Sequence, residues 1–285
     1  MKAIAYSLFG FDRGRVDNCF SFDSYLRGLM INIRFNRLLY PDWSVILETD
    51  QATYQGFEPL FKALEERNII RVEKNPNNTP LCAAMLWRIK PVFWTKPDQT
   101  WEFTHVICRD LDSPATYREV QAVNYWISKD RCMHAITDSI SHDVPLMGGM
   151  IGIRPDYFSS RLGVNSFTEF RALSKMDLSY KGSDQHFLNH VVYPKMGAKG
   201  SDSITQHYIL GHGNTFLSDW HNTIDDIGIG VSEELKETNA ICGHIGASGY
   251  YEPPTMKIIH KYKHLFSDLM NIEKQFYPQF FYWNT

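Results

Sequence analysis

The sequence predicts an α/β fold in which helices flank a mixed central sheet. Short apolar runs alternate with longer stretches of helical periodicity along the chain, which is the pattern of a sheet covered by helices. The apolar run 105–108 is typical of a strand buried on both faces. The chain has 285 residues, 44% hydrophobic and 21% charged, which is an ordinary globular composition and enough chain for one large domain or two small ones.

The first half of the chain begins with a strand over 4–9 and a helix over 24–39, whose residues Leu26, Leu29 and Ile33 would face the core. We then expect a strand at 43–48, a helix at 58–66, a strand at 69–73, a polar loop at 74–80 and a helix at 83–93.

The second half begins with the strand at 105–108, which ends at Arg109-Asp110-Leu-Asp112. Ser113 as N-cap and Pro114 as first helical residue predict a helix from 114 to about 128. A glycine-containing strand at 146–154 and a helix opening at 182–189 follow. We expect residues 1–255 to form one domain, and 256–285 to add a helix and an aromatic tail that pack on it or extend it.

Several classes of protein do not fit this composition. Lys plus Arg is 29 against 32 for Asp plus Glu, so the basic excess of a nucleic-acid binder is missing and we expect no nucleic acid as partner. Five scattered cysteines without a Cys-x-x-Cys pair argue against a disulfide framework and favour a reducing, cytoplasmic setting. The glycine-rich phosphate loops of dinucleotide enzymes and P-loop proteins are also absent from the sequence.

Asp110 and Asp112 are the strongest candidates for chemistry. Alternate residues of extended backbone share a face, so an Asp-x-Asp at the end of a buried strand directs two carboxylates to one point. Mn²⁺ or Mg²⁺ takes one or two carboxylates and fills its other positions with water and substrate phosphates. Ligands of open α/β sheets bind at this edge.

Four motifs in order resemble those of glycosyltransferase family 8. They are Ala84-Met-Leu-Trp-Arg88, Val106-Ile-Cys-Arg-Asp110-Leu-Asp112, Met147-Gly-Gly-Met-Ile-Gly-Ile153 and Asp184-Gln-His-Phe-Leu-Asn189. They are similar to the arginine helix, the Asp-x-Asp strand, the Asn-Ala-Gly strand and the Asp-Gln-Asp-x-Leu-Asn helix start of that family. The resemblance as a whole covers residues 1–195. The resemblance implies a GT-A (Rossmann-like) fold and a transferase that uses a nucleotide sugar.

The resemblance implies roles for residues around the nucleotide. Asp110 and Asp112 would hold Mn²⁺ or Mg²⁺ on the diphosphate of the donor, and Arg88 would lie beside that diphosphate. The backbone at the end of the first strand would cradle the base and ribose, at Tyr6, Ser7 and Leu8.

The resemblance also implies roles on the sugar side. Gly148 and Gly149 would let the donor sugar approach the main chain, and Asp184 and Gln185 would face the sugar and its anomeric carbon as catalytic residues. His186 stands where the family has a second aspartate. His244 only faintly echoes a C-terminal family motif, so a third metal ligand and an ordinary turn histidine are both open interpretations.

The function implied is metal-dependent transfer of a hexose from a nucleoside diphosphate sugar, with UDP favoured, to a hydroxyl of a glycan or glycolipid. Retention of anomeric configuration is favoured, although an inverting enzyme would need only one carboxylate base, which Asp184 could supply.

Two other functions stay open at this point. His134, Asp138 and His142 would form one polar row on a helix and could serve a metal-dependent hydrolase. Because i to i+8 spans about 12 Å on a straight helix, only adjacent pairs of them could share a metal ion. The second alternative is a catalytically silent GT-A-like binding protein.

The C-terminal stretch combines basic residues such as Lys257 and Lys261 with the aromatic tail 280–283. It could dock at an anionic membrane surface, where lipid-linked acceptors reside, or pack on its own domain. The expected location is therefore cytoplasmic, with peripheral membrane contact as an option.

Overall fold

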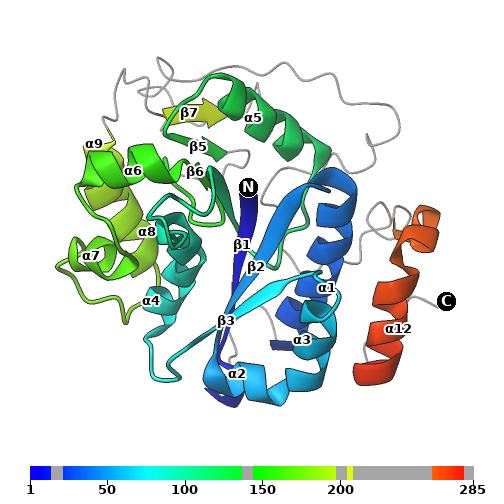
Figure 1. Cartoon of the computed structure of the whole chain (residues 1–285). Helices are drawn as coiled ribbons and strands as arrows, with labels where there is room; N and C mark the ends of the chain where they lie inside the picture. The colour runs from blue at the N-terminus through cyan, green and yellow to red at the C-terminus, as the bar shows by residue number, and fades with distance from the viewer. Residues whose placement is uncertain (14–21, 137–143, 197–203, 208–258, 279–285) are drawn as a thin grey trace.

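The computed structural model describes residues 1–13, 22–136, 144–196, 204–207 and 259–278 (Figure 1). In this part of the chain, seven strands form one sheet with the order β3-β2-β1-β4-β6-β5-β7. The strands are β1 Lys2–Leu8, β2 Trp43–Asp50, β3 Arg71–Asn75, β4 His105–Arg109, β5 Met133–Ile136, β6 Met150–Ile153 and β7 Ile204–His207. Strand β6 pairs antiparallel with β4 and β5, whereas the other neighbours pair in parallel. The predicted α/β fold with a mixed sheet is confirmed.

Helices cover both faces of this sheet (Figure 1). The longer ones are α1 Phe22–Leu39, α3 Glu58–Glu65, α5 Tyr117–Ser128, α6 Pro155–Leu162, the 3₁₀ helix η2 Leu86–Phe93 and α12 Ser267–Phe276. The shorter ones are η1 Phe11–Arg13, α2 Gln51–Gly56, α4 Leu81–Met85, α7 Phe167–Ala172, α8 Ser183–Phe187, the π-helical η3 Leu188–Val192, α9 Tyr193–Lys195 and η6 Lys263–Phe266.

Side-chain alternation divides the core into two layers. On β1, Ile4 and Tyr6 pack in a buried cluster with α1, α3, α5 and α12. Ala3 and Ala5 point the other way and pack in a second buried cluster with η2, α6, α7 and α8. Because the central strands are covered on both faces, they need apolar residues at successive positions, which explains the continuous apolar runs in the sequence.

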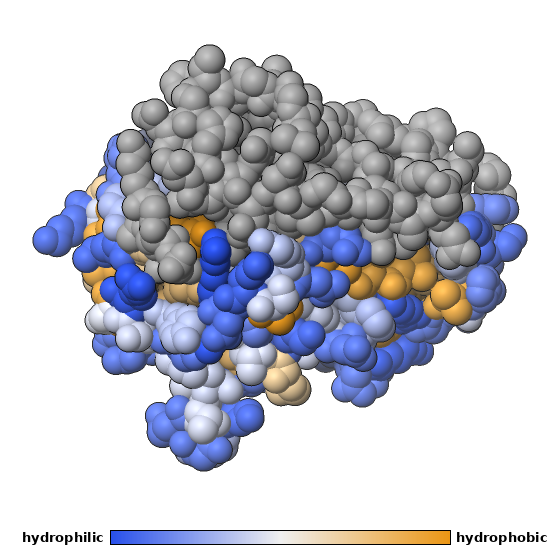
Figure 2. All heavy atoms as spheres, turned by 90° about the horizontal axis from the view of Figure 1, so that it is seen from above, coloured by the Kyte–Doolittle hydropathy of each residue, from blue (hydrophilic) through white to orange (hydrophobic). Residues whose placement is uncertain are grey.

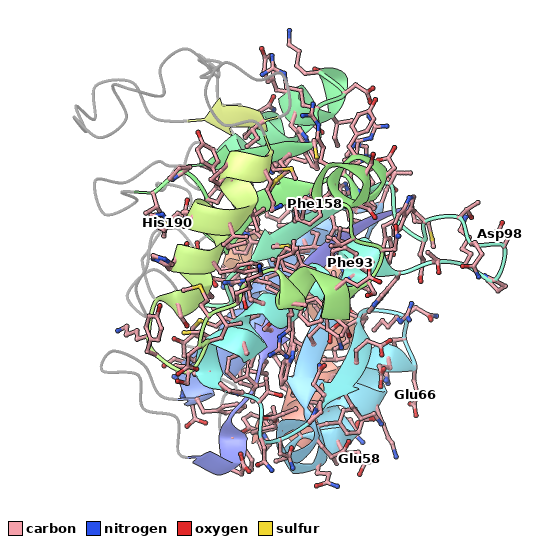
Figure 3. All side chains as sticks on the ribbon, turned by 90° about the vertical axis from the view of Figure 1, so that its left-hand side faces the viewer. Glu58, Glu66, Phe93, Asp98, Phe158 and His190 are labelled. Carbon is pink, nitrogen blue, oxygen red and sulfur yellow. The ribbon has the colours of Figure 1, made fainter. Side chains whose placement is uncertain are left out.

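Aromatic side chains fill much of the second layer. Phe93 of η2 lies beside Phe158 of α6, with ring centroids 6.1 Å apart (Figure 3). Phe170 of α7 lies within 5.6 Å of the first ring and 5.8 Å of the second. The loop that carries Asp98 projects from this body (Figure 3).

The described C-terminal helix α12 packs against α1. Arg34 and Glu273 form a fully buried ion pair with a Nη1–Oε1 distance of 2.9 Å, and Arg37 pairs with Asp268 at 2.7 Å on the surface. Leu269 belongs to the same buried cluster as the α1 residues. The helix expected within 256–285 is therefore found, in the described residues, as η6 and α12, which ends at Phe276, and the aromatic residues 280–283 lie outside the described residues.

Three predicted boundaries were wrong. The helix expected from Pro114 begins at Tyr117, because Thr116 and not Ser113 is the N-cap and accepts from the N–H of Glu119. The helix expected over 83–93 is a short α-helix followed by a 3₁₀ helix that contains Pro91, a residue that cannot donate an intrahelical hydrogen bond. The strand expected over 146–154 is shorter and covers Met150–Ile153.

The described surface is largely polar on one face. Among the residues that Figure 2 colours, hydrophilic side chains predominate on this face, with smaller hydrophobic areas between them. No helix among the described residues combines the length and the apolar character needed to cross a bilayer.

Candidate active site

The turn after β4 is held from inside the protein. Arg109 is buried, forms an ion pair with Glu119 at 3.0 Å, and donates to the carbonyl of Ser113 at 3.2 Å. Leu111 is also buried, and its carbonyl accepts from Nδ2 of Asn32 on α1 at 3.2 Å. Arg109 and Leu111 thus anchor the turn to the protein interior. The two residues that alternate with them, Asp110 and Asp112, are the ones available to form the site.

Asp110 and Asp112 lie close enough to repel one another. The side chain of Asp110 is 46% exposed. Burial and the neighbouring charge of Asp110 raise the pKa of Asp112 to about 7, against the opposing charges of Arg88 and Arg109. A divalent cation between such carboxylates would remove this repulsion.

Among the described residues, these two carboxylates are the donors that we consider for a metal ion. The described residues contain no group of three or more His, Cys, Asp and Glu side chains that could hold a metal ion. Mg²⁺ and Mn²⁺ sites that are completed by substrate phosphates need only one or two protein carboxylates. Asp110 and Asp112 therefore fit a cation that binds together with a phosphorylated substrate.

Arg88 of η2 is buried and forms an ion pair with Asp110. Burial lowers the pKa of Arg88, but the carboxylates of Asp110 and Asp184 raise it by more, so the guanidinium stays charged. Two contacts fix its backbone: Oγ of Ser7 accepts from its N–H at 3.0 Å, and its carbonyl accepts from Sγ of Cys108 at 3.4 Å. Arg88 is thus a positioned cation beside the Asp-x-Asp turn.

Gly148 and Gly149 bring the loop before β6 against this cation and carboxylate. A Cβ at position 149 would overlap the carboxylate of Asp110, and one at position 148 would lie 2.8 Å from Nη2 of Arg88. The two glycines therefore serve close packing within the protein. The sequence resemblance had connected them with the approach of a donor sugar.

Gln185 of α8 and Asn189 of η3 tie the same loop to these two consecutive helices. With its amide oriented to suit its neighbours, Gln185 donates to the carbonyl of Leu146 at 2.7 Å and accepts from the N–H of Gly148 at 2.9 Å. Asn189 accepts from the N–H of Leu146 at 2.8 Å and donates to its carbonyl at 2.9 Å. Gln185 therefore has a clear structural role, and Asn189 is a positioning residue to which the sequence analysis gave no role.

Asp184 lies beside this loop, at the start of α8. Its side chain is buried, and burial raises its pKa, while the charge of Arg88 and a hydrogen bond from Cys82 oppose the shift. The structure thus gathers Arg88, Asp110 and Asp184 around one point, although they come from separate parts of the chain.

The remaining predicted residues are the strand-end positions 6–8, named for their backbone, and His244. The side chains of Tyr6 and Leu8 are buried, and the hydroxyl of Tyr6 accepts from Nδ2 of Asn36 at 2.9 Å. Of these strand-end positions, Ser7 contacts the site, through the N–H of Arg88. His244 lies outside the described residues.

The expected helical row of His134, Asp138 and His142 does not hold for its first member. His134 lies in strand β5, is 2% exposed, and stacks on Trp126 with ring centroids 4.8 Å apart. Burial lowers its pKa to about 3. Asp138 and His142 lie outside the described residues. The short run Met133–Ile136 is a buried strand. It was not predicted because the polar residues at i, i+4 and i+8 suggested a helix.

A second polar cluster adjoins η2 and was missed by the sequence analysis. Glu48 of β2 is fully buried and accepts from Nδ2 of Asn75 at 2.8 Å and from Nζ of Lys90 at 3.3 Å. Burial raises the pKa of Glu48 to about 7, against the charge of Lys90. The signal in the sequence was Lys90 itself, two positions after Arg88 on the same helix.

No protein-family model and no curated protein matches the chain.

Proposed function

We propose that the protein is a metal-dependent glycosyltransferase that moves a hexose from a nucleoside diphosphate sugar to a hydroxyl of a glycan or glycolipid. One observation carries the proposal: three of the motifs meet at one point. Asp110 pairs with Arg88 and lies against Gly149, and the negative charge of Asp184 raises the pKa of Arg88. The motifs that resemble glycosyltransferase family 8 thus converge at the carboxyl end of β4. The GT-A-like interpretation is supported by the mixed sheet, with its single antiparallel strand among the described residues.

The nucleotide side of the proposed site is built on charge. Asp110 and Asp112 would hold Mn²⁺ or Mg²⁺, which supplies positive charge to the diphosphate of the donor and of the departing nucleotide. Arg88, held by Ser7 and buried, adds a fixed guanidinium that can bind phosphate oxygens with two N–H groups. Because this charge is already in place before reaction, it need not reorganise as the leaving group departs.

The sugar side of the proposed site is built on α8. Asp184 would face the sugar, and Gln185 would orient the loop that carries Gly148. We favour retention of anomeric configuration, with charge on the sugar ring stabilised by the departing diphosphate and by Asp184. If the enzyme inverts instead, Asp184 would act as the base that takes the proton of the acceptor hydroxyl. His244 as a third ligand and membrane contact by the C-terminal tail belong to the same proposal.

The first experiment is thermal unfolding of the wild type with UDP, GDP and their sugar conjugates, each with Mn²⁺, Mg²⁺ or EDTA. A ligand that binds the folded state raises the melting temperature. We expect one nucleotide to stabilise the protein in a metal-dependent way, with UDP favoured. Asp110→Asn should lose this stabilisation, whereas Asp98→Asn, on the projecting loop, should keep it.

Turnover separates the proposal from its alternatives. Transfer from the stabilising nucleotide sugar to an added glycan would support the transferase. A metal-dependent shift without release of nucleotide under any condition would indicate a silent binding protein. Chelator-sensitive hydrolysis of a substrate other than a sugar nucleotide, with no nucleotide-induced shift, would indicate a hydrolase and overturn the proposal.

A further inference from the structure

Asn32 is a fully buried amide that joins helix α1 to the Asp-x-Asp turn. Its Nδ2 donates to the carbonyl of Gly28, one helical turn back, at 2.9 Å. It also donates at 3.2 Å to the carbonyl of Leu111, which is 79 residues away along the chain. Asparagine is a poor residue for the interior of a helix, so the contact with the turn gives a reason for its presence in α1.

The carbonyl that Asn32 holds belongs to the peptide unit between Leu111 and Asp112. A trans peptide unit is planar, so its C=O and its N–H point in opposite directions and move together. The N–H of this unit is that of Asp112, and it hydrogen bonds to the Asp112 carboxylate. One planar group therefore connects the buried amide of Asn32 with a carboxylate of the candidate metal site.

A network of buried side chains fixes the orientation of the Asn32 amide. The hydroxyl of Tyr6 accepts from Nδ2 of Asn36 at 2.9 Å, and Arg109 also hydrogen bonds to it. Arg109 has only donors, so the hydroxyl proton is left to amide oxygens. These are Oδ1 of Asn32 at 3.4 Å and Oδ1 of Asn36 at 3.3 Å. With its oxygen towards Tyr6, Asn32 directs its nitrogen to the carbonyl of Leu111.

We propose that Asn32 is a positioning residue for the metal site, which sets the direction of the Asp112 carboxylate relative to Asp110 through the peptide unit that follows Leu111. The inference rests on the proposed function, because it needs a cation held by these two carboxylates. Mg²⁺ demands near-octahedral geometry, so such a cation binds best when its ligands already lie at the right angle. Residues that hold metal ligands from behind commonly change metal affinity by about 10–100-fold.

The test compares Asn32→Leu with Asn36→Leu in the full-length protein. Both variants replace a buried amide of α1, 0% and 2% exposed, by an apolar side chain. The Asn36 amide bonds to Tyr6 and not to the turn. Both variants should therefore melt at a lower temperature than the wild type, whereas only Asn32→Leu should affect the metal site.

The affinity for Mn²⁺ is the readout, because a merely structural role would not separate the two variants. Free Mn²⁺ is measured by its electron paramagnetic resonance signal, with UDP present and in a second series with GDP, at a temperature at which both variants are folded. We expect the Kd of Mn²⁺ to rise about tenfold in Asn32→Leu. In Asn36→Leu it should rise by less than about threefold, because the turn keeps its own amide contact.

A second pair of variants, Asn32→Ser and Asn36→Ser, keeps the test decisive if the leucine variants do not fold. The serine hydroxyl at position 32 can donate to the carbonyl of Gly28 within the helix. It is too short to reach Leu111, so Asn32→Ser should also bind Mn²⁺ more weakly than Asn36→Ser does.

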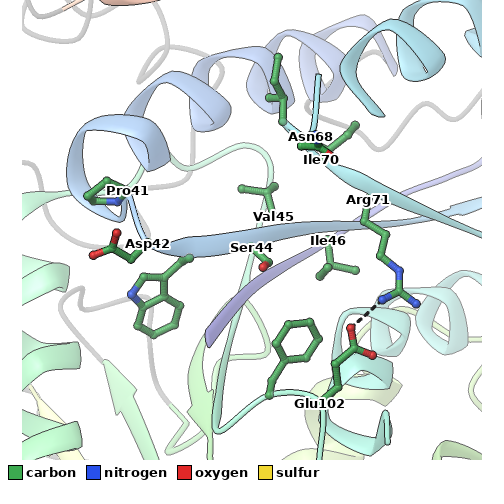
Figure 4. Close-up of a pocket in the computed structure, with 12 residues that line it drawn as sticks. Pro41, Asp42, Ser44, Val45, Ile46, Asn68, Ile70, Arg71 and Glu102 are labelled. Atoms are coloured by element: carbon green, nitrogen blue, oxygen red, sulfur yellow. Dashed lines mark hydrogen bonds and ion pairs between the residues drawn. The ribbon is translucent and has the colours of Figure 1, made fainter. Parts of the chain in front are cut away.

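A cavity at the opposite end of the sheet supplies a control for Mn²⁺ bound elsewhere. It measures about 410 Å³, and Asp42 and Glu102 line it beside the first residues of β2 (Figure 4). Glu102 pairs with Arg71 at 2.8 Å. The eight residues of β2 span about 25 Å towards the carboxyl end of the sheet, so this cavity lies far from Asp110. Asp42→Asn should therefore leave the Kd of Mn²⁺ unchanged.

The possible results separate this inference from the proposed function. Wild-type Mn²⁺ affinity in the Asn32 variants, or an equal loss in the Asn32 and Asn36 variants, would overturn the inference and leave the proposed function intact. If the wild type binds no Mn²⁺ with either nucleotide, or if Asp42→Asn abolishes the binding, the proposed metal site is wrong and the role of Asn32 falls with it.

Discussion

Gly149 lies so close to Asp110 that a methyl group on its Cα would overlap the carboxylate. Asp110 directly follows β4 and Gly149 directly precedes β6, and these two strands are antiparallel neighbours in the sheet. Arg88 contacts the same carboxylate from η2. The position of Asp110 is therefore set by a glycine on one side and an arginine on the other, and changes at either should move it.

Gly149→Ala tests this relationship. The added Cβ must displace the Asp110 carboxylate or the loop, because a side-chain contact that close does not occur in proteins. We expect metal-dependent nucleotide binding to fall by at least about tenfold, while the free energy of unfolding falls by about 1–3 kcal/mol. Thermal shift with UDP and Mn²⁺ measures the first quantity and urea unfolding measures the second.

Gly163→Ala is the matched control. This variant makes the same glycine-to-alanine change, and no atom lies within 4 Å of the position that the added Cβ would take, although the φ of +68° makes alanine strained there. It should therefore lose stability but keep nucleotide binding. If Gly149→Ala binds nucleotide and metal as the wild type does, the close contact with Asp110 has no part in binding.

Asn189→Ala should release the loop before β6. Asn189 makes two hydrogen bonds to the backbone of Leu146 and one to the carbonyl of Gln185 at 2.8 Å. Without the amide, the N–H of Leu146 loses its acceptor and should exchange with solvent faster, which hydrogen exchange measures directly. The expected loss of stability is about 1–3 kcal/mol.

The control for Asn189→Ala is Asn165→Ala, an exposed amide between α6 and α7. It should leave exchange at Leu146 unchanged. Unchanged exchange in Asn189→Ala as well would mean that the loop is held by Gln185 and the glycine contacts alone.

The end of β4 was predictable because its signal is local. The apolar run 105–108 identified a buried strand, and the aspartates that follow it had to lie at a sheet edge. The start of the next helix was not predictable in the same way. Ser113 is a good N-cap by type, but the structure uses its carbonyl to accept from Arg109, and Thr116 caps the helix instead.

The rest of the site depends on contacts between distant segments. Gln185 and Asn189 fix a loop about 40 residues before them, and Glu48 contacts Lys90 from another strand. Such pairs leave no periodic signal in a single sequence. The resemblance to a family placed Arg88, Asp110 and Asp184 on one site, whereas the geometry of the residues that support them required the structure.

Acid should destabilise the protein through His134. Burial lowers the pKa of His134 from 6.5 to about 3 in the folded state. Between these two pH values His134 is protonated in the unfolded chain but neutral in the folded protein. The stability present above about pH 6.5 is therefore lost as the pH falls towards about 3. Between pH 7 and pH 5 this amounts to about 2 kcal/mol.

Urea unfolding at pH 7 and pH 5 measures this loss as the difference between the wild type and His134→Phe, because Glu48 and Asp112, whose pKa values are raised to about 7, oppose it equally in both proteins. His134→Phe keeps an aromatic ring beside Trp126 but cannot be protonated, so its stability should fall less over the same pH interval, whatever its stability at pH 7. His264→Phe replaces an exposed histidine and should keep the wild-type slope. An identical slope in His134→Phe would assign the acid sensitivity to other groups, with His105 the next candidate because burial lowers its pKa to about 4.

The ion pair between Arg34 and Glu273 should contribute strongly to the attachment of α12. Their side chains are 1% and 4% exposed, so Glu273→Ala leaves a buried guanidinium without its carboxylate partner and should cost about 3–5 kcal/mol in urea unfolding. Asp268→Ala removes the carboxylate of the neighbouring pair with Arg37, whose side chains are 32% and 41% exposed, and should cost less than about 1 kcal/mol. If the two variants lose the same free energy of unfolding, the buried Arg34–Glu273 pair matters no more to α12 than the exposed Arg37–Asp268 pair does. A larger loss for Glu273→Ala, with faster amide exchange along 267–276, would show that the packing of α12 depends on a carboxylate that neutralises the buried Arg34.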